Sequence, residues 1–89
     1  MGDKRMKVVI ADNDDSFSGI LKAYMAEQDD FVLKRIVKHG DEVCSVVEEE
    51  RPDILIMDIL LPVLDGFAVL KRLTASGRRP TLTIVASVM

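Results

Sequence analysis

Apolar and polar residues alternate along the chain in blocks that predict strands and helices in turn. Short apolar runs followed directly by polar residues are typical of buried strands, and they occupy residues 7–11, 31–37, 54–58 and 82–86. The segments between them have apolar residues at helical spacing. They predict a helix that is capped by Asp14 or Asp15 and runs to about Gln28, a second that ends before Pro52 and a third over about residues 66–75.

Each predicted helix has its apolar residues on one face. In the first helix these residues recur at i, i+3, i+4, i+7 and i+8, and they are Phe17, Ile20, Leu21, Tyr24 and Met25. The second helix turns three valines inward, Val43, Val46 and Val47. The third carries Phe67, Val69, Leu70 and Leu73. All three helices are therefore expected to pack against a sheet.

The alternation of strands and helices predicts an α/β fold with a parallel sheet and right-handed crossovers. The chain is too short for a closed barrel, and an open, doubly wound sheet of the flavodoxin-like kind fits best. The strands at residues 7–11 and 54–58 are neighbours in that order. The more polar strand at residues 31–37 is expected near an edge.

Composition narrows the class of protein further. A chain of 89 residues makes one small domain, and its 48% hydrophobic and 30% charged residues predict a folded globular protein. No apolar run approaches the length of a membrane span. The net charge of −3 gives no electrostatic basis for nucleic-acid contact by this chain. One cysteine, Cys44, fits a reducing, cytoplasmic setting and core packing. His39 is expected to be a solvated loop residue.

Carboxylates follow two of the predicted strands. Asp12, Asn13 and Asp14 come after the first strand, and Asp58 ends the third. Because parallel strands gather functional groups at their carboxyl ends, these side chains are expected to meet. Such oxygen ligands suit Mg²⁺. Asp and Asn also serve as turn formers and helix caps after strands, but that role does not explain a hydrophobic strand that ends at Asp58.

The segments "VVIADND" and "PDILIMDILLPVLDGFAVLKRL" resemble the receiver domain of bacterial two-component response regulators. The segment "MDILLPVLDGFAVLKRL" is most similar to the stage 0 sporulation protein A group. The resemblance covers nearly the whole chain. It implies that residues 1–89 form a receiver domain truncated after the fourth strand, without the expected last strand and last two helices.

The resemblance also implies a mechanism. Asp58 would be the phosphoacceptor, taking a phosphoryl group from a sensor histidine kinase or phosphotransferase. Mg²⁺ would be held by Asp12, Asn13, Asp58 and the backbone carbonyl of Leu60.

Loop shape and regulation follow from the same resemblance. The loop after the acceptor would be shaped by Pro62, Asp65 and Gly66. A longer form would carry a DNA-binding output domain that controls transcription, of the sporulation type.

The sequence departs from the family pattern in several places. Asn13 stands where the family has a second acid, so Mg²⁺ binding is expected to be weaker unless Asp14 compensates. Leu61 replaces a methionine. Ala86 stands where a switch hydroxyl is expected, and Ser87 follows one residue later as the candidate for that role. The family's lysine on a fifth strand is absent.

Two alternatives remain from the residues. A degenerate or truncated receiver would act without phosphorylation as an interaction module, forming a homodimer or exchanging elements through the apolar strand at residues 82–86. An aspartyl phosphatase would need a second acid two residues after its nucleophile, where this chain has Leu60. The chain is therefore not expected to be an enzyme.

Overall fold

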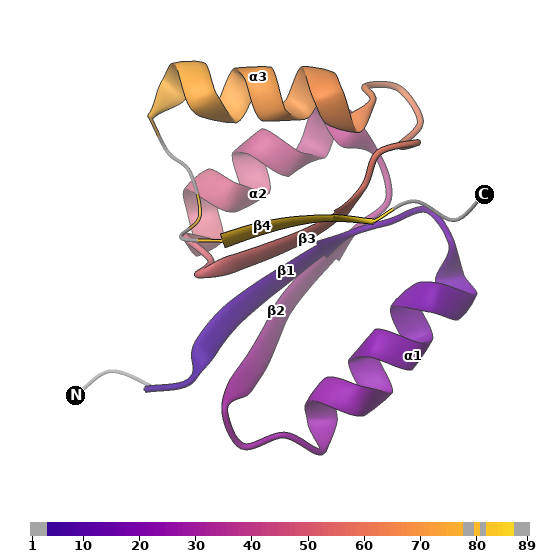
Figure 1. The fold of residues 1–89 in the computed structure, drawn as a ribbon, viewed down its shortest axis with the longest axis vertical. Coiled ribbons are helices and arrows are strands. Elements are labelled where there is room, and N and C mark those ends of the chain that lie inside the picture. Colours follow the sequence, from indigo (N-terminus) through magenta and orange to yellow (C-terminus); the bar gives the residue numbers. More distant parts are fainter. Residues whose placement is uncertain (1–3, 78–79, 81, 87–89) are drawn as a thin grey trace.

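The chain folds into a four-stranded parallel sheet with helices on both of its faces (Figure 1). The computed structural model describes residues 4–77, 80 and 82–86. The strands are β1 (Met6–Ala11), β2 (Phe31–Val37), β3 (Ile54–Asp58) and β4 (Leu82–Ala86). Their order is β2-β1-β3-β4, and all neighbours are parallel. This order confirms the flavodoxin-like prediction, with β1 beside β3 and β2 at an edge.

The sheet is buried on both sides at its centre. Val8, Val9, Ile10 and Ala11 of β1 have no exposed surface. A strand covered on both faces is apolar along its length rather than at alternate positions, which explains its continuous apolar run.

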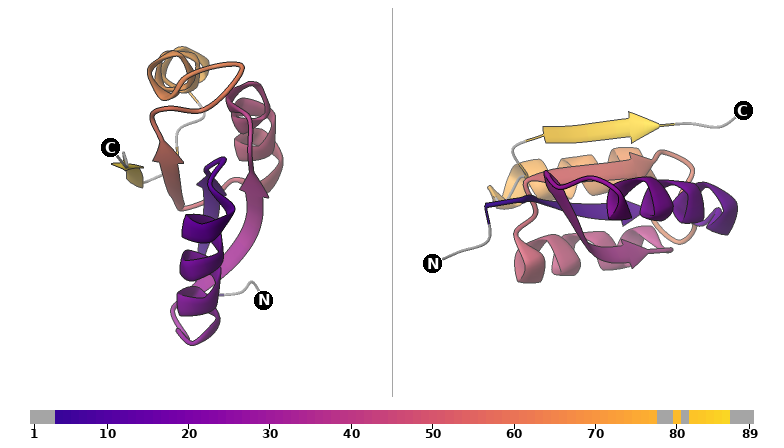
Figure 2. Two further views of the ribbon diagram at one scale, coloured as in Figure 1. Left: turned by 90° about the vertical axis from the view of Figure 1, so that its right-hand side faces the viewer. Right: turned by 90° about the horizontal axis from the view of Figure 1, so that it is seen from below.

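The helices form one layer on each side of the sheet (Figure 2). Helix α1 (Asp15–Ala26) lies on one face, and α2 (Val43–Glu50) and α3 (Gly66–Ser76) lie on the other. A short 3₁₀ turn, Gly40–Glu42, precedes α2. Alternate strand residues divide accordingly: Val9 and Leu55 belong to the core under α2 and α3, whereas Val8, Ile10 and Ile54 share a cluster with Met25 of α1.

Local sequence fixes the ends of the helices. The carboxylates of Asp14 and Asp65 accept backbone hydrogen bonds at the starts of α1 and α3, as N-caps do. Arg51 is the C-cap of α2 and has a positive φ of 48°. Pro52 follows it. Gly77 ends α3 in the left-handed conformation that glycine adopts without strain. None of the described helices is long and apolar enough to cross a bilayer.

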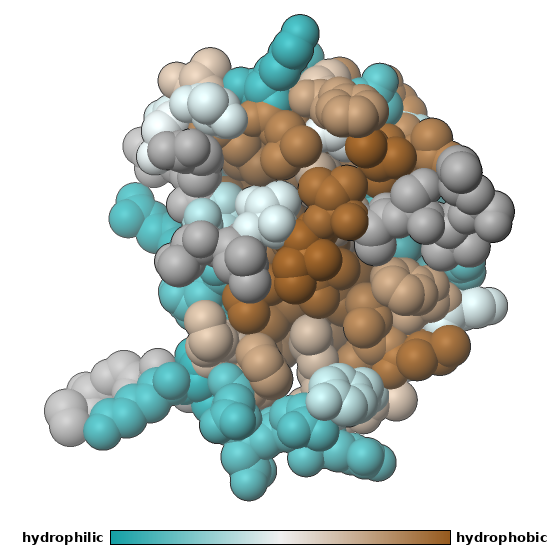
Figure 3. All heavy atoms as spheres, viewed as in Figure 1, coloured by the Kyte–Doolittle hydropathy of each residue, from teal (hydrophilic) through white to brown (hydrophobic). Residues whose placement is uncertain are grey.

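Only part of the apolar face of α1 is buried. Met25 is 9% exposed, whereas Ile20 and Tyr24 are 68% and 58% exposed. The apolar stripe is wider than the strip of helix that contacts the sheet, so its outer part faces solvent. Phe67 of α3 is exposed for the same reason. In Figure 3, apolar surface extends across the middle of the molecule, where Figure 1 shows β3 and β4, and Ile84 and Val85 of β4 are exposed.

Candidate functional site

The candidate site lies at the edge where β1 and β3 end. Ala11 of β1 pairs in register with Met57 of β3. The next residues, Asp12 and Asp58, therefore lie side by side on adjacent strands, which are about 4.8 Å apart in parallel sheets. The structure thus brings together the two strand-end carboxylates that the sequence predicted would meet.

Asp12 is the more buried carboxylate, with 3% of its surface exposed. Its backbone N–H donates to the carbonyl of Val37 at 2.9 Å, and its Oδ1 accepts a hydrogen bond from the backbone N–H of Asp14 at 2.7 Å. Burial raises the pKa of Asp12. The bond from Asp14 opposes this shift, and the negative charges of Asp58 and Asp14 raise the pKa further.

Asp58 is more open to its surroundings. Its side chain is half-buried, and Oδ1 accepts a hydrogen bond from the backbone N–H of Leu60 at 3.0 Å. Among the described residues, no hydrogen bond engages Oδ2 of Asp58. One carboxylate oxygen is therefore held by the loop while the other is available for chemistry.

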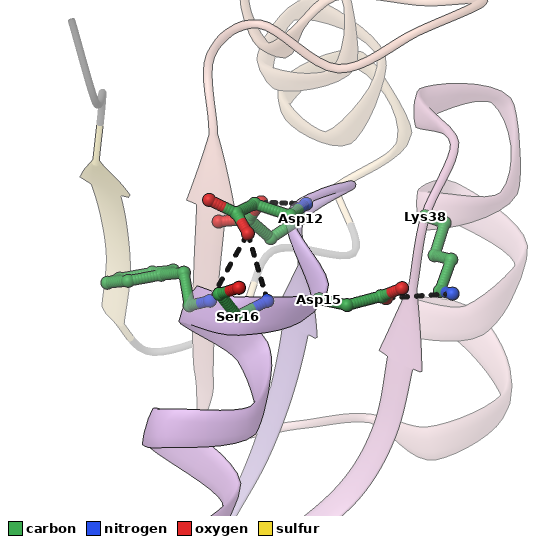
Figure 4. Close-up of polar contacts among 6 residues, drawn as sticks. Asp12, Asp15, Ser16 and Lys38 are labelled. Atoms are coloured by element: carbon green, nitrogen blue, oxygen red, sulfur yellow. Dashed lines mark hydrogen bonds and ion pairs between the residues drawn. The ribbon is translucent and has the colours of Figure 1, made fainter.

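The two polar residues after Asp12 differ in what they do. Asn13 is exposed. Oδ1 of Asp14 accepts hydrogen bonds from the backbone N–H groups of Ser16 and Phe17, at 2.9 and 3.4 Å (Figure 4). This oxygen belongs to the N-cap of α1, and compensation by Asp14 for the missing acid at Asn13 stays a prediction.

The predicted metal ligands fit Mg²⁺ in their chemistry. Across residues 4–77, 80 and 82–86, no three histidine, cysteine, aspartate or glutamate side chains gather as a metal centre. The predicted set has two carboxylates, Asp12 and Asp58, completed by the amide of Asn13 and the carbonyl of Leu60. All are oxygen donors. The repulsion that raises the pKa of Asp12 is of the kind that a divalent cation relieves.

The loop after Asp58 depends on close backbone packing at Gly66. The N–H of Gly66 donates to the carbonyl of Ile59 at 2.9 Å. A Cβ at Gly66 would lie 2.8 Å from the Cα of Ile59. Asp65 caps the helix that starts there, with its Oδ1 3.0 Å from the N–H of Ala68. Glycine at position 66 thus lets α3 begin directly against the end of β3.

The same loop is also held at Gly40, a contact that was not predicted from the sequence. Its N–H donates to the carbonyl of Pro62 at 3.0 Å, and a Cβ at Gly40 would overlap the carbonyl oxygen of Leu64. Between these contacts, Val63 adopts a positive φ of 71° as the N–H of Leu64 bonds back to Pro62 at 2.8 Å. The sequence signal for this contact was a glycine at the start of a helix. Glycine has no side chain, so another segment can approach its backbone closely.

An ion pair at the edge was also missed. Nζ of Lys38, directly after β2, lies 2.8 Å from Oδ1 of Asp15 at the start of α1 (Figure 4). No motif predicts it, because the two residues are distant in sequence and meet only in the folded sheet.

The structure also places the other residues discussed from the sequence, with the exception of Ser87. His39 is exposed, with Nδ1 3.1 Å from Oε1 of Glu42, as expected of a loop residue. Cys44 is half-buried against the core, and burial raises the pKa of its thiol, which disfavours the reactive thiolate. Leu61 is 5% exposed and belongs to the core. Ser87 lies outside the described residues, whereas Ala86 pairs in register with Asp58.

Comparison with protein families decides the class. The response regulator receiver domain family matches residues 8–88, nearly the whole chain. The chain belongs to this family. The narrower resemblance to the stage 0 sporulation protein A group gains no support from these comparisons and stays a prediction.

Solved structures agree with this membership. The response regulator domain of Thermotoga maritima CheB is 29% identical, with a TM-score of 0.84, and the match covers 93% of this receiver and 60% of that chain. A Francisella response regulator receiver domain is 25% identical, with a TM-score of 0.84 and coverage of 96% and 68%. This receiver therefore spans about three fifths of the length of the CheB domain.

A more distant structure shares the fold alone. RcsB from Salmonella enterica, bound to promoter DNA in the presence of the phosphomimetic BeF₃⁻, is 18% identical with a TM-score of 0.80. The match covers 93% of this receiver and 42% of the RcsB chain.

Proposed function

We propose that this receiver accepts a phosphoryl group on Asp58 and acts as a signalling module rather than as an enzyme. The observation that carries the proposal is the placement of Asp58 beside Asp12 after paired strand residues, with one oxygen of Asp58 held by the N–H of Leu60. That bond fixes the carboxylate while Oδ2 has no partner among the described residues.

The proposed chemistry is nucleophilic attack by a carboxylate. An oxygen of Asp58 forms a bond to phosphorus as the P–N bond to the donor histidine breaks. The imidazole keeps the electron pair of that bond and takes up a proton. Catalysis of this kind rests on positioning and on neutralisation of charge, and the hydrogen bond from Leu60 contributes to the first.

Asp12, Asn13, Asp58 and the carbonyl of Leu60 would hold Mg²⁺. When bound, the ion would supply the charge neutralisation that two neighbouring carboxylates and an incoming phosphoryl group require. Asp12 would hold the ion from a buried position, and burial fixes the direction of the Asp12 carboxylate. Asn13 contributes an oxygen without a charge, so we expect weaker affinity than two acids would give.

The proposed partner is a sensor histidine kinase or phosphotransferase that supplies the phosphoryl group. In a longer form, we propose that the receiver controls a DNA-binding output domain. RcsB, which has the same fold, binds promoter DNA in the presence of a phosphoryl mimic. Sporulation is proposed as the process controlled, on the wording of residues 57–73 alone.

The test is intact-mass measurement after incubation with acetyl phosphate and Mg²⁺. We expect a single phosphate adduct on the wild-type chain. The adduct is not expected to form when a chelator removes Mg²⁺, or on the Asp58→Asn variant. Circular dichroism of both proteins checks that the variant is folded. A folded wild-type chain without an adduct, or an adduct that persists in Asp58→Asn, would refute the assignment.

A second candidate function is an interaction module that works without phosphorylation, as a homodimer or through exchanged elements. The observation that favours it is the exposure of apolar side chains on β4, with Ile84 and Val85 42% and 41% exposed. Apolar edge strands favour pairing with another chain.

A further inference from the structure

The carboxyl edge of the sheet carries mostly negative charge. Carboxylates end or follow β1 and β3 there, or lie at the starts of α1 and α3, namely Asp12, Asp14, Asp15, Asp58 and Asp65. Among the described residues that join a strand end to the next helix at this edge, Lys38 is the only lysine or arginine. Within these described connections, a dianionic phosphoryl donor therefore meets more negative than positive charge, and Lys38 carries the positive charge.

The structure holds Lys38 beside the site. The preceding residue, Val37, accepts the backbone hydrogen bond of Asp12 at 2.9 Å. The ammonium group of Lys38 lies 2.8 Å from Oδ1 of Asp15, and the two side chains remain 51% and 77% exposed. An ammonium group has three donors, so this pairing leaves the cation able to interact with an anion that arrives from solvent.

Lys38 acts across the site without touching Asp58. β2 and β3 flank β1, so their ends are two strand spacings apart, about 10 Å. This separation is close to the Debye length at about 0.1 M salt. The charge of Lys38 is therefore felt at the acceptor at low ionic strength and is screened at high ionic strength.

We propose that Lys38, held at the rim by Asp15, is a specificity-determining residue that favours dianionic phosphoryl donors. The inference rests on the proposed phosphoacceptor role of Asp58. A unit charge acting on a dianion over about 10 Å of water-like medium corresponds to a three- to fivefold change in donor binding at low salt. Because the distance to the reacting atoms changes little during transfer, the effect is expected in KM rather than in kcat.

The experiment compares rates of phosphorylation by acetyl phosphate, with saturating Mg²⁺ and at low ionic strength. Lys38→Gln is expected to raise KM about three- to fivefold with kcat unchanged, and the difference is expected to shrink as salt increases. Lys38→Arg keeps the charge and is expected to behave as wild type. Lys22→Gln is the matched control, because it removes the same charge from the exposed side of α1.

Asp15→Asn separates the electrostatic role from a structural one. It breaks the same ion pair but keeps the cation and removes a negative charge, so KM is expected to stay at or below the wild-type value. Thermal unfolding is expected to change equally in Asp15→Asn and Lys38→Gln, because both lose the pair. If the pair only supported the fold, both variants would raise KM together.

Three results would overturn the inference. If Lys38→Gln had the wild-type KM at low salt, Lys38 would have no effect on donor binding. The role of Asp58 as acceptor would be unaffected. Equal increases in Lys38→Gln and Lys22→Gln would show a general effect of net charge. Failure of the folded wild-type chain to accept phosphate would overturn the proposed function and this inference together.

Discussion

Asp12 carries its charge where the fold leaves little contact with water, and stability depends on pH as a result. Burial and the neighbouring charge of Asp58 raise its pKa in the folded state. Below the unfolded pKa of about 3.9 the carboxyl is protonated in both states. As the pH rises from there through the folded pKa, the folded state binds more protons and loses stability, and above it the full penalty persists.

We therefore expect Asp12→Asn to be more stable than the wild type at neutral pH. The amide oxygen can still accept the hydrogen bond from the N–H of Asp14, while the repulsion with Asp58 disappears. The difference is expected to vanish below about pH 3. Urea unfolding across the pH range measures it, and a less stable Asp12→Asn at neutral pH would show that the charged carboxylate supports the fold.

Ser18 offers a second test at the level of one side chain. Its hydroxyl is buried on α1, and no described residue accepts or donates a hydrogen bond to it. Ser18→Ala is expected to raise the free energy of unfolding by about 1 kcal/mol, because an unpaired buried hydroxyl is removed. Ser45→Ala is the control, since its exposed hydroxyl donates to the carbonyl of Glu42. A destabilised Ser18→Ala would indicate a partner such as a bound water.

At the scale of elements, the sequence predicted what is determined locally. The strands, a cap of α1 at Asp14 or Asp15 and the end of α2 before Pro52 depend on neighbours a few residues away. The contact of Gly40 with the loop after β3, and the ion pair of Lys38 with Asp15, join segments distant in the chain. Periodicity carries no information on such pairs, or on how much of the apolar stripe of α1 the sheet can cover.

The packing of Gly40 against that loop gives a prediction for two elements together. Gly40→Ala is expected to lower the free energy of unfolding by more than about 2 kcal/mol, because the new Cβ overlaps the backbone of Leu64. The hydrogen bond from Gly40 to Pro62 would be lost as well. Equilibrium denaturation measures the loss.

Gly19→Ala provides the matched control for the same chemical change. A Cβ at Gly19 meets nothing within 4 Å, and the residue lies inside α1. Alanine there is expected to stabilise the protein by about 0.5–1 kcal/mol through helix propensity. If both alanine variants were equally stable, the loop after β3 would have room to move away from Gly40.

At the scale of the whole molecule, the two edges of the described sheet differ. β2 presents Lys34 and Arg35, charges that discourage pairing with another chain, whereas β4 exposes Ile84 and Val85 on successive positions and thus on opposite faces. Self-association, where it occurs, is therefore expected through β4.

Ile84→Lys tests this expectation. A charge at the centre of β4 is expected to shift the protein toward the monomer in analytical ultracentrifugation at increasing concentration. Ile20→Lys, on the exposed side of α1, is the comparison, and it is expected to leave the association unchanged. Dissociation caused by Ile20→Lys would instead place the contact on α1. If Ile84→Lys left the association unchanged, β4 would not be part of the contact.

The central place of β1 also determines how fast different parts of the protein open. Its amides reach solvent only after a neighbouring strand has moved away, so their exchange for deuterium is expected to be the slowest in the sheet. β4 is hydrogen-bonded within the described sheet to β3 alone and opens at a lower free energy. Asp12 directly follows β1, whose last four residues have no exposed surface, whereas Asp58 ends β3, in which Ile56 is partly exposed. Two carboxylates that are neighbours in space are thus held by backbone that fluctuates on different timescales.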